Sequence, residues 1–471
     1  MRHTGLMAGD YTDAQWIALA FVFLGITLIL AIAVRRYVRI LEKLYIPASV
    51  IAGFLILLLG PQALGALTGS WSLLPAPVME VLARLPGLMI NVVFAGIMIG
   101  KSLPSVRTIW RESAPHVILG SVFSFGQFAL GALAVAFVLT PLFGLPDAAG
   151  SILELSFAGG HGTIAGMGAL LDDAGAPEVI DIGLGLATIS MITGVVGGSL
   201  LVNYGIRNPR IDVARTRPVT SVAIDLRDIA PNSGDTREKD VGLGSVSRSF
   251  GAIALAVAVG LLILELLRSV AHVFGSDVFD SFPLFPFTVI GGFLVQLVLT
   301  ATHREELVER RTVNDITGLS LDILIASAIG TMSLAALGAN IPSLAILTAI
   351  AFAWSVVGML WLGPRIHRTD WFEHAIADYG QSQGNVATGF VLADMADPAR
   401  ETTTARAYGY KQLTYEPLLG GGLLTAFSVP LIVEIGSAWF GAICVVITAA
   451  LIAWGMLRDR RRAPGRQEGA V

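Results

Sequence analysis

The chain has 471 residues, of which 54% are hydrophobic and only 14% are charged. Soluble domains carry about 25% charged residues, so this composition excludes a soluble globular protein and predicts an all-α polytopic membrane protein. The formal net charge of −4 says little, because the placement of Lys and Arg matters more than their sum in a membrane protein. A single cysteine, Cys444, excludes an intrachain disulfide and a cysteine-based metal site.

Apolar stretches long enough to cross a hydrocarbon core of about 30 Å recur along the whole chain. They lie at 15–34, 46–64, 86–100, 116–140, 182–204, 249–270, 283–301, 316–338, 342–363, 412–433 and 437–457. Basic residues follow the first stretch rather than precede it, so we interpret it as a transmembrane helix and not as a secretory signal. Two further stretches, 150–171 and 371–395, are apolar but interrupted by Gly and polar residues.

Clusters of Lys and Arg orient these segments. The clusters lie at 35–43, 101–111, 207–217, 303–311, 365–368 and 458–462. By the positive-inside rule they face the cytoplasm, which predicts a multi-pass protein of the cell (inner or plasma) membrane, with its N-terminus outside and its C-terminus cytoplasmic. All clusters face the cytoplasm only if residues 150–171 and residues 371–395 each enter and leave the membrane on the same side. Both stretches are therefore expected to be re-entrant.

The two halves of the chain resemble each other. Three pairs of segments align in the same order: IPASVIAGFL from Ile46 with FPFTVIGGFL from Phe285, GLMINVVFAGIMIGKSL from Gly87 with GLSLDILIASAIGTMSL from Gly318, and HGTIA from His161 with QGNVA from Gln383. Each half has five expected spanning helices, and this odd number forces the second half to insert upside down. Inverted repeats with matching broken segments are typical of secondary transporters that bind substrate near the membrane midplane.

This repeat divides the chain. Residues 1–206 form the first repeat, with the re-entrant segment 150–171, and residues 249–435 form the second, with 371–395. The polar stretch 207–248 is expected to be a cytoplasmic linker. Residues 436–471 then form an additional transmembrane helix and a basic cytoplasmic tail.

The first interrupted stretch has a Gly-rich centre. Its members are Gly159, Gly160, His161, Gly162 and Thr163. Non-helical backbone is tolerated at membrane depth only where protein or a water-filled cavity satisfies its polar groups. Because glycine allows unusual backbone conformations and freed amides can hold an anion, we assign these five residues to substrate binding. The alternatives are a close helix-packing contact for the glycines and an interior hydrogen-bonded role for His161.

The repeat-equivalent stretch offers neutral oxygens and amides instead. We assign its side chains to the substrate at Gln381, Ser382, Gln383 and Thr388. Gly384 and Asn385 are assigned to Na⁺, because neutral oxygens suit a hard cation. On the helix that follows the first motif, hydroxyl groups are available from Thr188, Ser190 and Thr193.

Two polar residues occupy equivalent positions inside the expected third and eighth helices, Asn91 and Asp322. A carboxylate inside a membrane helix costs about 2.5–3.5 kcal/mol on insertion scales, so Asp322 is a candidate ion ligand, with Asn91, or a candidate proton carrier. The alternative is that Asp322 pairs with another buried polar group. Glu154 and Asp394 flank the two Gly-rich motifs and are weaker candidates.

These motifs together make the sequence similar to the sodium/glutamate symporter family over residues 16–433. The resemblance rests on GGHGT at 159–163, on ATISMITGVVGGSLL at 187–201, on Tyr45-Ile46-Pro47 with 50–55, and on Ala393-Asp394-Met395. It implies a homodimer of two inverted five-helix repeats that takes up glutamate with Na⁺ by an elevator-type movement. The second motif departs from the family pattern, GFGLGATPTA, because here it reads QSQGNVATGF.

The resulting hypothesis is a secondary transporter for a small glutamate-like anion. It needs no cofactor beyond Na⁺ as the coupling ion, it lies in the lipid bilayer, and it has no nucleic-acid partner. The alternatives are a proton- or sodium-coupled carrier of another organic anion, and a channel or solute-binding membrane sensor. An enzyme is not expected, because no metal motif or nucleophile–base pair is evident.

Overall fold

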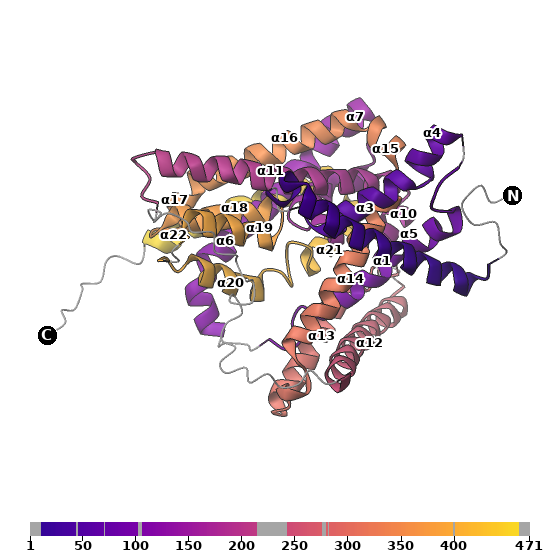
Figure 1. Ribbon diagram of the computed structural model, residues 1–471. Helices are drawn as coiled ribbons and strands as arrows, with labels where there is room; N and C mark the ends of the chain where they lie inside the picture. Colours follow the sequence, from indigo (N-terminus) through magenta and orange to yellow (C-terminus); the bar gives the residue numbers. More distant parts are fainter. Residues whose placement is uncertain are drawn as a thin grey trace.

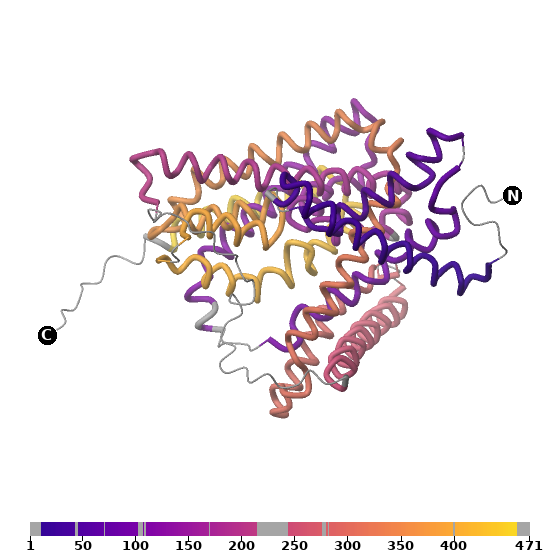
Figure 2. The backbone as a smooth tube through the Cα atoms, in the orientation of Figure 1, coloured from indigo at the N-terminus to yellow at the C-terminus, as the bar shows by residue number. Residues whose placement is uncertain are grey.

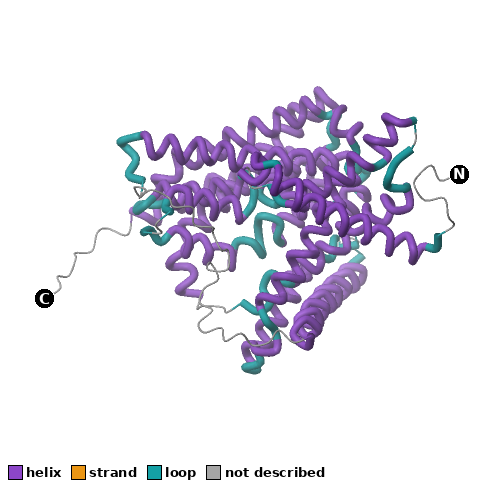
Figure 3. Tube along the Cα trace, viewed as in Figure 1, coloured by secondary structure: helices purple, strands orange, loops and turns teal. Residues whose placement is uncertain are grey.

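The computed structural model describes residues 11–43, 46–69, 71–101, 106–213, 243–275, 279–280, 282–398 and 401–460. Within these ranges every regular element is a helix, and no strand is present (Figure 3). Most of the expected cytoplasmic linker, residues 214–242, and the basic tail beyond residue 460 lie outside the described residues. An all-helical chain of this composition agrees with the expected polytopic membrane protein.

In the described part of the chain, nine helices or end-to-end helical runs are long and apolar enough to cross a membrane. They are built on α1 (Asp13–Tyr37), α3 (Ala48–Leu59), α5 (Ala76–Ala95), α6 (Val106–Ala134), α11 (Glu178–Arg207), α12 (Leu243–Val273), α14 (Arg310–Thr331), α16 (Ile341–Val357) and α22 (Ser437–Arg460). Shorter helices between them include α13 (Phe285–Ala301), α15 (Leu334–Ala339) and α17 (Gly363–Ile366).

One expected span is not a continuous helix. Residues 412–433 were expected to cross the membrane, but α20 (Thr404–Thr414) ends early, and eight residues separate it from α21 (Leu423–Ile435). Pro417 in the connection lacks an amide donor, and Gly420 and Gly421 have positive φ angles of 65° and 105°. This segment is a third interruption of the helical structure, in addition to the two expected ones.

Several other spans begin earlier than expected, α6 and α12 among them, and α5 and α14 show the reason. The stretch expected at 86–100 is α5, which begins at Ala76, and the stretch expected at 316–338 is α14, which begins at Arg310. In both cases charged residues near the start of the helix, Glu80 and Arg84 in α5 and Arg310 and Arg311 in α14, lower the hydropathy of its first turns. Helix α14 stops at Thr331, and α15 follows as a separate short helix.

The helices form two packed groups. Helices α1, α3 and α5 pack with α14, and α12 packs with α13, which also contacts α5. In the other group α6 packs along α22 and α20, while α11 packs against the interrupted segments. In Figure 1 the first group lies toward the labelled N-terminus and the second toward the C-terminus. Figure 2 shows orange and yellow segments of the second half lying among magenta and purple segments of the first.

Candidate functional site

The first interruption separates α8 (Ile152–Phe157) from α9 (Gly160–Gly166). The non-helical part is shorter than the sequence indicated, because His161, Gly162 and Thr163 lie inside α9. Gly160 has a φ of 76°, a conformation that strains any residue with a Cβ atom. The helical path is broken next to this glycine, and its positive φ angle is the feature of the motif that requires glycine.

The second interruption separates α18 (Trp371–Ser382) from α19 (Val386–Ala396). Asn385 caps α19, because its Oδ1 accepts a hydrogen bond of 2.9 Å from the amide of Thr388. The Thr388 hydroxyl donates to the same oxygen at 3.2 Å. Both predicted site residues therefore hold the start of α19, after a turn at Gln383 and Gly384 that ends α18.

The two interruptions meet. A Cβ atom on Gly160 would lie 3.9 Å from the carbonyl oxygen of Gly384. Helix α11 contacts both sides of this junction through two hydroxyl groups. His161 Nε2 lies 3.0 Å from Thr188 Oγ1, and Thr193 Oγ1 donates to Gln383 Oε1 at 3.3 Å. The structure thus brings together the two motifs that the repeat paired, about one face of α11.

The side chains before the second interruption are engaged inside the protein. Gln383 donates from Nε2 to the carbonyl of Ala351 at 2.9 Å and to Ser355 Oγ at 2.8 Å. Ser382 donates to the carbonyl of its own helix at Tyr379. Gln381 Nε2 donates to Gln412 Oε1 at 2.9 Å. Because the partners of Gln383 and Gln381 lie on α16 and α20, these two side chains fix the segment to its neighbours.

The two candidate ion ligands in the first group of helices lie to the side of this junction. Asp322 on α14 is exposed and lies beside Ser49 of α3. Asn91 on α5 donates from Nδ2 to the carbonyl of Gly87 in its own helix at 2.8 Å. The residues that precede them in the chain, Leu321 and Ile90, lie near the first interruption. A Cβ atom on Gly162 would be 3.4 Å from Leu321 and 4.0 Å from Ile90.

The third interruption packs against the first, and the sequence analysis missed it. The amide of Gly420 donates to Glu154 Oε1 at 3.2 Å, and Thr425 Oγ1 donates to the same oxygen at 3.2 Å. Gly421 lies so close to Thr163 that a Cβ atom would overlap the threonine hydroxyl. The signal that was available is the run Gly420-Gly421-Gly422 inside an apolar stretch. Glu154 is fully buried, and it lies between the first and the third interruption.

A second polar cluster lies deeper in the second group of helices. It contains His116 of α6, His367 after α17, His374 and Asp378 of α18, and Lys411 of α20. All five side chains are buried, and Lys411 Nζ lies 2.9 Å from Asp378 Oδ1. Lys411 also donates to Gln381 Oε1 at 2.7 Å, which links the cluster to the second interruption. These residues are far apart in sequence, so no spacing motif indicated them.

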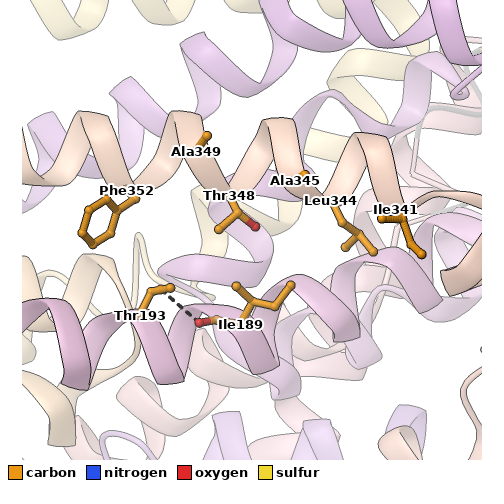
Figure 4. Close-up of a pocket in the computed structure, with 8 residues that line it drawn as sticks. All are labelled: Ile189, Thr193, Ile341, Leu344, Ala345, Thr348, Ala349 and Phe352. Atoms are coloured by element: carbon orange, nitrogen blue, oxygen red, sulfur yellow. Dashed lines mark hydrogen bonds between the residues drawn. The ribbon is translucent and has the colours of Figure 1, made fainter.

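An apolar cavity of about 610 Å³ opens between α11 and α16 (Figure 4). Its lining residues are Ile189, Thr193, Ile341, Leu344, Ala345, Thr348, Ala349 and Phe352. Figure 4 shows α16 on one side and Ile189 and Thr193 of α11 on the other. A carboxylate would lose its hydration here without charged partners, so this cavity does not suit a glutamate-like anion. Thr193 connects its wall to Gln383 of the second interruption.

We expect Gly160→Ala to reduce transport much more than a matched glycine variant. A left-handed conformation costs a residue with a Cβ atom about 1–2 kcal/mol, and here the new methyl group would also face Gly384. Gly144→Ala is the control, because Gly144 has a φ of 69° and open space around it. Uptake by both variants in proteoliposomes, at equal reconstituted amounts, measures the difference. Equal losses in both would show that the junction itself is not involved.

The helical fold and its paired interruptions define a multi-pass membrane protein, with irregular backbone gathered in its interior. A family model for the sodium/glutamate symporter matches residues 16–363. The chain therefore belongs to the sodium/glutamate symporter family. Membership places it among sodium-coupled membrane transporters rather than among enzymes. A comparison with curated proteins found no match.

Proposed function

We propose that the protein is a symporter that moves glutamate or a related carboxylate together with Na⁺ by elevator-type alternating access. The observation that carries this proposal is the junction of Gly160 with Gly384, where two interrupted helices from different halves of the chain meet. Paired broken helices in corresponding positions are the usual binding-site architecture of secondary transporters. Family membership supports sodium as the coupling ion and glutamate as the type of substrate.

We further propose that the two halves are inverted repeats and that both interrupted segments are re-entrant. The order of elements supports this, because α3 and α13, α5 and α14, and the segments α8–α9 and α18–α19 correspond along the two halves. The basic clusters then all face the cytoplasm, with the N-terminus outside and the C-terminus inside. The proposed functional unit is a homodimer, which light scattering of the purified protein in detergent would measure.

The proposed roles follow the position of each group. Backbone and side-chain groups at Gly159–Thr163 and the start of α19 hold the substrate carboxylate. Oxygens of Gly384 and Asn385 hold Na⁺, and Asn385 is suited to this because its side chain orders the start of α19. Asp322 and Asn91 tune ion affinity from the neighbouring group of helices. They directly follow Leu321 and Ile90, the residues that face Gly162.

The two packed groups of helices supply the moving parts of the proposed elevator. Helix α9 contacts α5 and α14 across the boundary between the groups. The side chains that approach Gly162 are the apolar ends of Leu321 and Ile90, which would lie 3.4 Å and 4.0 Å from a Cβ atom at this glycine. Apolar contacts without hydrogen bonds let two surfaces slide without leaving buried polar groups unpaired.

Uptake of labelled glutamate into proteoliposomes tests the proposed function. We expect accumulation that requires an inward Na⁺ gradient and is lost when choline replaces Na⁺. Competition by unlabelled carboxylates of different length then ranks the substrates. Uptake that is the same with Na⁺ and with choline would contradict sodium coupling, and competition only by a different anion would identify another cargo.

We expect Asn385→Ala to weaken the apparent affinity for Na⁺ and to lower stability by about 1 kcal/mol, the usual cost of losing a helix cap. Ser333→Ala is a matched control, because Ser333 Oγ caps α15 by accepting from the amide of Ala336 at 3.2 Å. It should lose similar stability without a change in Na⁺ dependence. Uptake measured against Na⁺ concentration separates the two variants, and Asp322→Asn in the same assay tests the role of Asp322.

A further inference from the structure

Glu154 of α8 is a buried carboxylate without a cationic partner in the part of the chain that the structure describes. Its exposed fraction is 0%, and none of the ion pairs between described residues includes it. Asp378 of α18 is buried as well, but the ammonium of Lys411 lies 2.9 Å from it. Because an ionised carboxylate away from water is costly unless it is paired, Glu154 needs a counter-charge that the described side chains do not supply.

The two carboxylate oxygens of Glu154 have different surroundings. Oε1 accepts hydrogen bonds from the amide of Gly420 and from Thr425 Oγ1, each at 3.2 Å. Since both groups donate to Oε1, this oxygen acts as an acceptor, as in the ionised form. Oε2 is enclosed and accepts no hydrogen bond from the described residues. Ser124 of α6 lies beside the carboxylate, but its hydroxyl is 2.6 Å from Tyr415 Oη. The lone pairs of Oε2 are thus available to a cation.

Further oxygens lie where the first and third interruptions meet. Ala158 follows the end of α8, and its carbonyl oxygen accepts no backbone hydrogen bond from the described residues. A Cβ atom on Gly420 would be 3.6 Å from this oxygen. The hydroxyl of Thr425 lies on the other side of Glu154, at Oε1. Carbonyl oxygens at the end of a broken helix, together with carboxylate oxygens, are suitable ligands for a hard cation.

The balance of charge selects a monovalent cation. One such ion beside Glu154 leaves no net charge, whereas a divalent ion would leave one excess positive charge in a buried site. The site also lies close to the surface of the protein. Gly420, whose amide contacts the carboxylate, is itself half-buried, and Leu418 is 45% exposed. A small ion therefore has to pass only a residue that has no side chain.

We propose that Glu154 anchors a sodium site between the first and third interruptions, with the carbonyl of Ala158 and the hydroxyl of Thr425 as further ligands. This site uses different residues from the sodium position proposed at Gly384 and Asn385. The transporter then binds a second sodium ion, which balances the only charge that Glu154 carries.

The bound ion ties the third interruption to the first. Without it the charge of Glu154 is unbalanced, and Gly420 and Gly421 are expected to move away from α8 and α9. Gly421 lies against Thr163, which belongs to the motif assigned to the substrate. Sodium at Glu154 should therefore raise the affinity for the substrate, and substrate should raise the affinity for sodium by the same factor.

Sodium-dependent stability tests the site without transport. The melting temperature of the purified protein in detergent is measured against NaCl, with choline chloride keeping the ionic strength constant, because a bound ligand raises apparent stability. Asn385→Ala serves as the background, so that the other proposed ion position contributes little. Adding Glu154→Gln keeps an oxygen for Gly420 and Thr425 but removes the charge. We expect the half-saturating Na⁺ concentration to rise about 10-fold or more, the lower end of the cost of losing a partner of a metal ligand.

Other variants keep the test decisive if this one folds poorly. Thr425→Val removes a proposed ligand and should also raise the half-saturating Na⁺ concentration, whereas Thr425→Ser should restore it. Asp181→Asn is the matched control, because Asp181 Oδ1 accepts from the amide of Ser333 at 2.7 Å. It should leave the sodium dependence unchanged. In choline, Glu154→Gln should be more stable than the unaltered protein, since no charge remains buried.

Three results would overturn the proposal. The first is a sodium-dependent shift that is the same with and without Glu154→Gln. The second is an equal shift with KCl, which would exclude sodium as the specific occupant. The third is a gain in stability in choline on acidification that requires Glu154 and that Na⁺ does not reproduce, which would assign the site to a proton.

Uptake gives a second readout, and this part of the test rests on the proposed function. The Hill coefficient of uptake for Na⁺ should fall from about 2 in the unaltered protein to about 1 in Glu154→Gln. The same coefficient in both would contradict a coupled ion at Glu154. No uptake by any variant or by the unaltered protein would contradict symport, and the sodium-dependent stability would still support the site.

Discussion

Asp378→Asn and Lys411→Met are each expected to lower the free energy of unfolding by about 3–5 kcal/mol, because either change leaves an uncompensated charge in the interior. Both side chains are fully buried, and Nζ and Oδ1 are 2.9 Å apart. The remaining charge would keep only part of its hydrogen bonds. In Lys411→Met, Asp378 would keep its contacts with His116 and His367. In Asp378→Asn, Lys411 would keep its hydrogen bond to Gln381. Tryptophan fluorescence during denaturation in detergent would measure the change.

The double variant distinguishes a lost pair from lost charge balance. Asp378→Asn/Lys411→Met removes both charges, so it should recover much of the stability that either single variant loses. Glu265→Gln, which breaks the partly exposed pair Glu265–Arg268 at 2.7 Å and leaves the other hydrogen bonds of Arg268 in place, should cost about 1 kcal/mol or less. A double variant that is less stable than both single variants would show that the two residues do not act as a pair.

The class of protein and the position of the first two interruptions followed from local composition. Long apolar stretches predict spanning helices whatever lies around them, and a Gly-rich motif such as that at Gly160 weakens a helix wherever it occurs. The sequence repeat added the information that the motifs at His161 and Gln383 correspond. That is why the meeting of the two segments, unlike most tertiary contacts, could be anticipated.

Other features depend on contacts that hydropathy does not describe. The third interruption was missed because Gly420, Gly421 and Gly422 count as neutral in an apolar window, although they let the backbone pack on Thr163. The starts of α5 and α14 were placed too late because polar residues at a membrane surface can be helical. Asp322 was assigned to the ion from its sequence position alone, and only the packing of α14 on α3 shows that its side chain lies beside Ser49.

The histidine cluster could not be derived from spacing at all. His116 and Asp378 are 262 residues apart, and His374 and Lys411 lie on different helices. Only the packing of α6, α18 and α20 places them together. A weak sign was present along α6, where His116, Gly120, Ser124 and Gln127 recur at helical spacing. This stripe faces the cluster, since a Cβ atom on Gly120 would lie 2.5 Å from Lys411 Nζ.

Gly194→Ala is expected to reduce uptake by about 10-fold or more while the protein still folds. Gly194 lies in the middle of α11, where a Cβ atom would be 2.5 Å from the carbonyl oxygen of Gln383 and 3.1 Å from its carbon. The obstacle is backbone, so no side-chain rotation can relieve it, and the second interruption must move away from α11. A displacement of about 1 Å at a binding site can cost about 100-fold in rate, which makes a 10-fold loss a modest expectation.

The control for this prediction is a Gly→Ala change at a helical position with open space around it. Alanine is favoured over glycine inside a helix by about 1 kcal/mol, so Gly251→Ala in α12, where nothing lies within 4 Å of the new methyl group, should keep or raise stability and leave uptake unchanged. Gly194→Ala carries the same helical benefit, so any loss must come from the contact with Gln383. Because that contact belongs to the segment proposed to hold substrate and Na⁺, the loss should appear in both apparent affinities. Normal uptake by Gly194→Ala would mean that the second interruption can shift freely, and the site would then have to lie elsewhere.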